Sequence, residues 1–301
     1  MEMLVFGHGY SAGYLTPLLT AAGWRVTGTT REDISRVAAA GAVPLRWPGQ
    51  EDEVRAALAR ADAVLVSAAP TERGDPVLAA FAGELARAKL RWLGYLSTTG
   101  VYGDRQGGWV DEESELDGSG PRGQARVRAE SAWQALARAH GLPLHIFRLA
   151  GIYGPGRGPF AKLRAGTARR IVKPGQVFSR IHVEDIAQVL KASIDNPRPG
   201  GIYNLCDDDP APPQDVLEHA AHLLGLPVPP AVPFEEAAPK MSPMARSFYA
   251  DSKRVRNDRL KNELGVTLLY PDYRSGLAAV LAAEGDGAAW TPAPAHGGTG
   301  A

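Results

Sequence analysis

The stretch that decides the fold is Met3-Leu4-Val5-Phe6-Gly7-His8-Gly9-Tyr10-Ser11-Ala12-Gly13-Tyr14-Leu15, near the start of a chain of 301 residues. A short apolar run ends at Gly7, and an apolar helical pattern follows at once. This order predicts a strand, a tight turn and a helix N-terminus, which together bind a dinucleotide pyrophosphate. Gly7 permits the turn, Gly9 lets the backbone approach phosphate oxygens, and Ala12 allows close helix–strand packing. The helix start near Ser11 offers free N–H groups to the anion.

The end of the second predicted strand, residues 24–30, should meet the adenosine ribose about 20 residues after the glycines. Thr29, Thr30 and Arg31 stand there, and no carboxylate does. An acidic side chain would bind the ribose hydroxyls of NAD, whereas a guanidinium binds a phosphate through several donors. The sequence therefore predicts a preference for NADP(H). The alternative is that Arg31 is only a solvated charge at a helix start.

Composition excludes several classes of function. The formal net charge is zero and the pI is about 7.1, so nothing favours nucleic acid or an anionic membrane as a partner. The one cysteine, Cys206, excludes an intrachain disulfide and a cysteine metal cluster, and a buried, inert thiol is expected. The first strand begins at residue 3, which leaves no room for a signal peptide, and no apolar run approaches the ~20 residues of a membrane span. We expect a cytoplasmic protein.

Strand and helix patterns alternate through the first half of the chain. Strands are predicted at 3–6, 24–30, 42–46, 63–66, 92–97 and 144–149, with helices at 34–40, 51–60, 77–89 and 127–140. This alternation predicts an α/β fold with a doubly wound parallel sheet. We expect a dinucleotide-binding domain at 1–155, a smaller irregular substrate lobe at 156–283 with a helix at 183–193 that crosses back, and a disordered tail at 284–301.

Five blocks of sequence resemble the extended and atypical members of the short-chain dehydrogenase/reductase superfamily, the NAD-dependent epimerase/dehydratase proteins. They occur in the right order and cover roughly residues 1–205: Gly7–Gly13, Leu96–Asp104, Arg148–Arg157, Arg180–Ala187 and Gly201–Leu205. Further on, Ser252-Lys253-Arg254, Leu264-Gly265 and Tyr270–Tyr273 resemble a small bacterial subgroup of atypical members.

The resemblance implies a role for several residues. Thr98 takes the place of the Ser/Thr that binds the reacting oxygen of the substrate, and 182–185 resembles a motif that ties the second lobe to the sheet. Ala68-Ala69-Pro70 matches the turn under the cofactor ribose, while Gly151 and Ile152 match the backbone beside the nicotinamide. The predicted cofactor-binding residues are Gly7, His8, Gly9, Tyr10, Ser11, Ala12, Thr30, Arg31, Ala68, Ala69, Pro70, Ser97, Gly151 and Ile152, with no metal site.

The chain departs from the family where extended members carry a Tyr and, four residues later, a Lys as the proton-transfer pair. Counting back from Glu130, Arg122 stands at the Tyr position and Arg126 at the Lys position. A guanidinium does not exchange protons at neutral pH, so neither arginine replaces the phenol. Thr99 and Gly100 stand where dehydratases have an acidic pair, so dehydration is not expected.

Three interpretations stay open. The favoured one is an NADP(H)-dependent oxidoreductase or epimerase-like enzyme of a small carbonyl or sugar-type substrate, with Thr98 and either Tyr102 or Tyr153 as catalytic residues. For each tyrosine the alternative is a structural role, in which the ring packs against the loop and the hydroxyl only forms a hydrogen bond within the protein. The second interpretation is a non-catalytic redox sensor, and the third is a scaffold that binds no dinucleotide.

The substrate and the oligomeric state are less defined. Six basic residues of the second half would suit an anionic small-molecule substrate, or form a solvated helix face: Arg157, Lys162, Arg164, Arg169, Arg170 and Arg180. A homodimer, common in the superfamily, is an open alternative.

Overall fold

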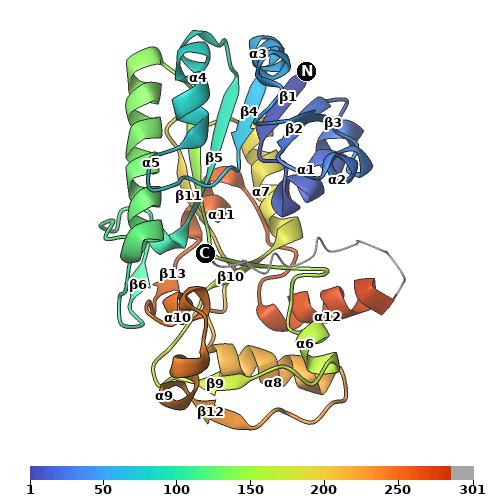
Figure 1. Ribbon diagram of the computed structural model, residues 1–301, viewed down its shortest axis with the longest axis vertical. Helices are drawn as coiled ribbons and strands as arrows, with labels where there is room; N and C mark the ends of the chain where they lie inside the picture. The colour runs from blue at the N-terminus through green and yellow to red at the C-terminus, as the bar shows by residue number, and fades with distance from the viewer. Residues whose placement is uncertain (286–301) are drawn as a thin grey trace.

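The computed structural model describes residues 1–285 and places a seven-stranded parallel sheet at the centre of the molecule (Figure 1). Its order is β11-β7-β5-β4-β1-β2-β3. The strands are β1 (Glu2–Phe6), β2 (Arg25–Thr30), β3 (Val43–Arg46), β4 (Ala63–Val66), β5 (Trp92–Thr98), β7 (Leu144–Leu149) and β11 (Ile202–Leu205). The predicted doubly wound α/β fold is confirmed. The six predicted sheet strands are all present, and β11 adds a seventh from the second half of the chain.

Helices cover both faces of this sheet, which explains why its strands are apolar on both sides. One face carries α1 (Tyr10–Ala21), α2 (Ile34–Ala39) and α7 (Val183–Asp195), and the other carries α3 (Glu51–Arg60), α4 (Pro76–Arg87) and α5 (Gly120–His140). In β1, Met3 and Val5 pack toward the first set while Leu4 and Phe6 pack toward the second. The alternation follows from the two-residue period of a strand.

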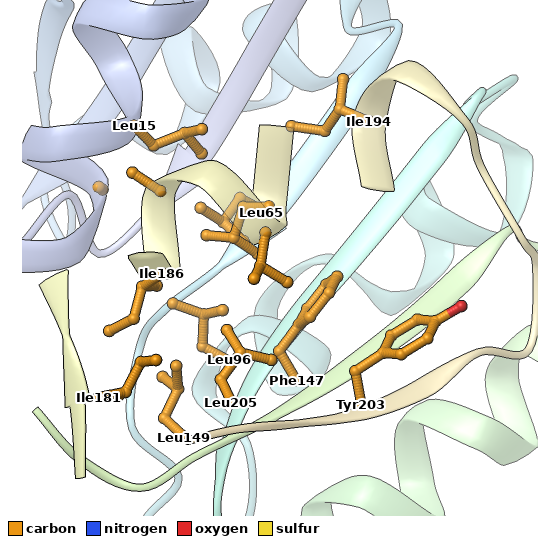
Figure 2. Close-up of a cluster of buried hydrophobic side chains, with 14 of the residues drawn as sticks. Leu15, Leu65, Leu96, Phe147, Leu149, Ile181, Ile186, Ile194, Tyr203 and Leu205 are labelled. Atoms are coloured by element: carbon orange, nitrogen blue, oxygen red, sulfur yellow. The ribbon is translucent and has the colours of Figure 1, made fainter. Parts of the chain in front are cut away.

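The core on the α1–α7 face joins the two halves of the chain (Figure 2). Leu15 of α1, Leu65 of β4 and Phe147 of β7 meet Ile186 of α7 and Leu205 of β11, and all five side chains are buried. Burying an aliphatic or aromatic side chain of this size contributes about 1.5–3 kcal/mol. The helix expected to cross back is therefore part of the sheet's main core, packed against α1.

The smaller lobe lies beyond the carboxyl ends of the sheet strands (Figure 1). Three two-stranded ribbons border or build it: β8 (Gly151–Tyr153) with β10 (Arg180–His182), β9 (Arg170–Val172) with β12 (Ala231–Pro233), and β6 (Trp109–Val110) with β13 (Arg254–Val255). The remaining helices are α6 (Phe160–Arg164), α8 (Pro213–Leu223), α9 (Phe234–Ala237), α10 (Pro243–Phe248), α11 (Asp258–Leu264) and α12 (Tyr273–Gly285), with 3₁₀ turns η1 (Thr99–Tyr102) and η2 (Ala238–Lys240). The predicted domain boundaries stay a prediction.

Helix α5 starts well before its predicted position, and helix α12 reaches into the predicted tail. Helix α5 begins at Gly120 rather than at 127, because Pro121 is tolerated in a first turn, where its missing N–H would have no partner. Helix α12 continues to Gly285, so the first two residues of the predicted tail are helical, and the rest of that tail lies outside the described residues. Within residues 1–285, no helix is both long and apolar enough to cross a membrane.

Candidate cofactor and substrate site

The glycine loop between β1 and α1 has the shape that the sequence predicts. Gly7 has a φ of +78°, and a Cβ there would lie 2.9 Å from the backbone nitrogen of Ala68. Gly9 precedes α1 without a side-chain cap, and a Cβ on it would meet only the Gly7 carbonyl oxygen, at 3.7 Å. The first-turn N–H groups of α1, which include Ser11 and Ala12, are thus left for an anion.

The end of β2 holds this loop in place. The N–H of Gly7 donates to Thr29 Oγ1 at 2.9 Å, and the N–H of His8 donates to the Thr29 carbonyl at 2.7 Å. Thr29 is therefore a support for the glycine loop, while Thr30 accepts a bond from the N–H of Glu32 at 3.4 Å.

The imidazole of His8 points into the protein. Its Nε2 lies 2.8 Å from Thr16 Oγ1, and the Thr16 hydroxyl itself donates to the Ala12 carbonyl, so Nε2 carries the proton. Gly28 makes room for the ring, because a Cβ there would come within 2.6 Å of it. Burial lowers the pKa of His8 to about 4, so the ring is neutral at pH 7. Only the backbone of His8 is available to a cofactor.

Tyr10 also turns away from the loop. Its hydroxyl donates to the Pro155 carbonyl at 3.0 Å, and the Arg157 guanidinium lies over its ring at 5.7 Å. Gly154 is the neighbour that allows this approach, since a Cβ there would be 2.5 Å from the Tyr10 hydroxyl. The Tyr10 side chain links the glycine loop to the turn after β8.

Arg36 is a residue of this region that the sequence pattern did not predict. Its Nη2 donates to the His8 carbonyl at 3.2 Å, and its Nε is buried without a hydrogen-bond partner. Arg31, which was predicted, is exposed and has no hydrogen bond or ion pair to another residue in the described range. The available signal was a basic residue in the first turn of α2, six residues after the end of β2.

The other wall of the site is built from the carboxyl ends of β4, β5 and β7. Sheet register aligns Phe6 with Val66 and Thr98 with Leu149, so the segments that follow these strands emerge at one edge. Ala68, Ala69 and Pro70 follow β4, and Gly151 and Ile152 follow β7, with Ile152 packed on the core.

Ser97 and Thr98 close β5 at this same edge. Thr98 Oγ1 accepts a bond from the N–H of Gly100 at 3.1 Å and so caps η1. Ser97 Oγ is buried and has no partner. The buried hydroxyl without a partner and the glycine loop, where a side chain would take the space, leave a hydrogen-bonding group and room for a dinucleotide. The residues present fit the predicted cofactor.

Tyr102 is enclosed in a polar network inside the protein. Its hydroxyl donates to Asn204 Oδ1 at 2.7 Å and accepts from Arg148 Nη1 at 2.9 Å, while Arg148 forms a buried ion pair with Glu130 at 2.8 Å. Burial raises the pKa of Tyr102 to about 12. Its predicted role as a proton donor stays a prediction, and this geometry disfavours it.

Tyr153 faces the smaller lobe. Its hydroxyl lies 3.5 Å from the Asp272 carbonyl, and a Cβ on Gly276 of α12 would come within 1.9 Å of it. Burial raises the pKa of this phenol above its ordinary value. Its role as an acid also stays a prediction, since the hydroxyl is wedged against α12.

The two arginines at the proton-transfer positions behave differently. Arg122 is exposed on the first turn of α5, whereas Arg126 donates to the Leu96 carbonyl at 2.6 Å and to the Tyr95 hydroxyl at 3.2 Å. Arg126 therefore fixes the backbone of β5 next to Ser97 and Thr98. It supports the site without being able to move a proton.

The segment before β13 clamps the loop that follows η1. The Ser252 carbonyl accepts from the N–H groups of Arg105 and Gly107, at 3.0 and 2.9 Å. Lys253 Nζ donates to the Gly103 carbonyl at 2.6 Å and to Asp251 at 3.1 Å. The block that resembles the bacterial subgroup is thus the anchor of the loop beside Thr98.

The motif at residues 182–185 ties the lobe to α7. Asp185 accepts from the N–H groups of Leu269 and Tyr270, at 2.7 and 3.1 Å. The His182 ring packs on that of Tyr270, with ring centroids 4.1 Å apart, and burial lowers its pKa to about 4. These contacts are structural.

The basic residues of the lobe are largely engaged within the protein. Arg164 pairs with Glu284 and Arg170 with Glu218, and Arg180 donates to two backbone carbonyls. An anionic substrate stays a prediction.

Known proteins resemble this chain over much of its length. A model of the NAD dependent epimerase/dehydratase family matches residues 3–206. Protein YeeZ of Escherichia coli K12 is 29% identical over 289 residues, covering 90% of this chain and 97% of YeeZ. A 3-diazoavenalumate denitrifying reductase of Streptomyces is 29% identical over 178 residues, which are 56% of this chain and 58% of the reductase.

Solved structures extend the comparison. A functionally unknown conserved protein from Silicibacter pomeroyi is 57% identical, with a TM-score of 0.88 and coverage of 93% of this chain and 98% of that one. Human epimerase family protein SDR39U1 with NADPH is 20% identical, with a TM-score of 0.73 and coverage of 93% of this chain and 99% of SDR39U1. UDP-glucuronic acid 4-epimerase from Bacillus cereus with NAD is 15% identical, with a TM-score of 0.73 and coverage of 93% of this chain and 97% of the epimerase. The last two structures contain NADPH and NAD, respectively, and their likeness to this chain is one of fold.

Proposed function

Because the chain belongs to the NAD-dependent epimerase/dehydratase family, we propose that it is an NADP(H)-binding oxidoreductase or epimerase-like enzyme of a small carbonyl or sugar-type substrate. The observation that carries the proposal is the glycine loop, which presents an uncapped helix start beside Gly9 at the sheet edge where β5 ends with the unpartnered hydroxyl of Ser97. A nicotinamide cofactor supplies or accepts a hydride when it is bound.

The preference for the phosphorylated cofactor rests on the end of β2. No carboxylate ends that strand, and two guanidinium groups, Arg31 and Arg36, follow it. Arginine suits a phosphate because its planar group presents several donors at once. The lone cysteine, Cys206, is buried as a free thiol, as is typical of proteins from reducing compartments, so a cytoplasmic location is part of the proposal.

The chain's own residues position a substrate better than they protonate it. Thr98 lies at the end of β5, where it would orient a reacting oxygen, and Arg126 holds the adjoining backbone. The phenols of Tyr102 and Tyr153 are enclosed, and Arg122 does not exchange a proton. This arrangement also favours the second candidate, an NADP(H)-binding redox sensor without turnover.

One set of titrations tests the proposal. NADPH and NADH are titrated into the protein, and NADPH oxidation is followed with a panel of carbonyl compounds. Tighter binding of NADPH with turnover supports the enzyme, and tight binding with altered protease sensitivity but no turnover supports the sensor. Equal affinities, or tighter binding of NADH, would exclude the NADP(H) preference.

A matched pair of variants tests the site itself. Gly9→Val adds a Cβ that would be in ordinary contact with the Gly7 carbonyl oxygen, at 3.7 Å, and the φ of −106° suits any residue, so the chain should fold while the pyrophosphate is blocked. Gly13→Ala, one turn further along α1, meets no atom within 4 Å and should bind as the wild type does. Equal binding by both variants would place the cofactor elsewhere.

A further inference from the structure

We propose that Arg36, rather than Arg31, is the residue that distinguishes NADP(H) from NAD(H) by binding the 2′-phosphate. The inference rests on the proposed cofactor and adds the identity of the specificity-determining residue.

Arg36 is attached to the glycine loop itself. Its Nη2 donates to the His8 carbonyl at 3.2 Å, and the N–H of His8 donates to the Thr29 carbonyl at 2.7 Å. The guanidinium is therefore held at a fixed place between the pyrophosphate turn and the end of β2, which is where the adenosine ribose lies in this fold.

The guanidinium of Arg36 keeps donors and space for a ligand. It forms no ion pair with a residue of the described chain, and its Nε has no hydrogen-bond partner. Together with Asp33 and Ser35 it lines the α2 side of a groove of about 1290 Å³ that begins at Gly9 and runs along α1 to α7. The carboxylate of Asp33 is engaged in capping α2, where it accepts from the N–H of Arg36 at 3.0 Å. A phosphate would supply the negatively charged partner that this guanidinium lacks.

Arg31 is a weaker candidate on the same grounds. It is exposed and makes no hydrogen bond within residues 1–285, so a phosphate would have to immobilise a free side chain. Ordering a free arginine costs rotamer entropy that the anchored Arg36 has largely lost already.

The test compares two nucleotides that differ only in the 2′-phosphate, adenosine 2′,5′-bisphosphate and adenosine 5′-monophosphate. Calorimetric titration of the full chain should show that the wild type prefers the bisphosphate. Arg36→Ala should weaken binding of the bisphosphate roughly 10- to 100-fold, the range for a charge-assisted hydrogen bond, and leave the monophosphate within about 3-fold. Arg31→Ala, the matched control, should change either affinity by no more than about 3-fold.

A second variant separates recognition from folding. Arg36→Lys keeps the charge but lacks the fork that reaches the His8 carbonyl and a phosphate together, so its bisphosphate affinity should lie between wild type and Arg36→Ala. Equal losses for both nucleotides in both Arg36 variants would reduce Arg36 to a support for the loop and overturn the inference. A preference that survives Arg36→Ala but disappears in Arg31→Ala would overturn it too, while the NADP(H) proposal would stand. A wild type without any preference would instead refute the NADP(H) proposal.

Discussion

Replacing Tyr102 by Phe separates a structural role of this residue from a catalytic one. The change removes one hydroxyl from a fully buried site and keeps the ring. Asn204 Oδ1 then loses a donor at 2.7 Å, and Arg148 Nη1 loses an acceptor at 2.9 Å, although it still reaches the Glu112 carbonyl at 3.3 Å. A buried polar group left without its partner costs about 1–3 kcal/mol.

With two groups affected and one partly compensated, we expect the free energy of unfolding to fall by about 2–3 kcal/mol. Urea unfolding measures this as a lower midpoint at an unchanged slope. Tyr153→Phe is the matched control, because its hydroxyl makes only a long contact of 3.5 Å, and it should cost less than about 0.5 kcal/mol. NADPH binding should survive in both variants. Wild-type stability in Tyr102→Phe, together with complete loss of turnover, would refute the structural assignment and restore Tyr102 as the acid.

Three further outcomes follow from the same geometry. Gly7→Ala, at a φ of +78° and with a Cβ 2.9 Å from the Ala68 nitrogen, should abolish NADPH binding in a titration and lower stability by at least about 1 kcal/mol. Glu130→Gln leaves the buried charge of Arg148 uncompensated and should cost about 3–5 kcal/mol in urea unfolding, so a loss below about 1 kcal/mol would contradict the buried ion pair. Burial lowers the pKa values of three histidines to about 4: His8, His145 and His182. Between pH 6.5 and 4 the unfolded chain binds more protons at these sites, so each should reduce stability by about 1.4 kcal/mol per pH unit as the pH falls. Unfolding midpoints at pH 7.5, 6 and 5 measure the slope, and His145→Gln, whose amide can still accept from the N–H of Arg198, should make it shallower.

Much of the sheet follows from local sequence. The run Ala63–Val66 is apolar at every position, and β1 alternates between two buried faces, so both are predicted as strands of a covered parallel sheet. The first turns of α5 are not predictable in this way, because Gly120 to Arg126 has no apolar period. Strand β11 was missed as a sheet strand because its place beside β7 depends on a pairing 56 residues apart in register, Ile202 with Ile146.

In the candidate site, too, the features set by local sequence were predictable and those set by distant residues were not. The glycine turn is local chemistry, so Gly7 and Gly9 could be identified from their spacing alone. The directions of side chains are not local: His8 and Tyr10 both point away from the loop because Gly28 and Gly154, distant in sequence, leave room for them. Arg36 escaped notice because its link to the His8 carbonyl spans 28 residues.

The clamp on the loop after η1 has a consequence for the order in which the protein is made. The bond from Lys253 to the Gly103 carbonyl joins residues 150 positions apart. At ~5–20 residues per second, a ribosome needs on the order of 10 s to synthesise that interval. During this time the emerging chain already contains β1, the glycine turn and β2, whereas the loop beside Thr98 still lacks its anchor. The residues of the pyrophosphate cradle are therefore synthesised well before the anchor of the substrate side.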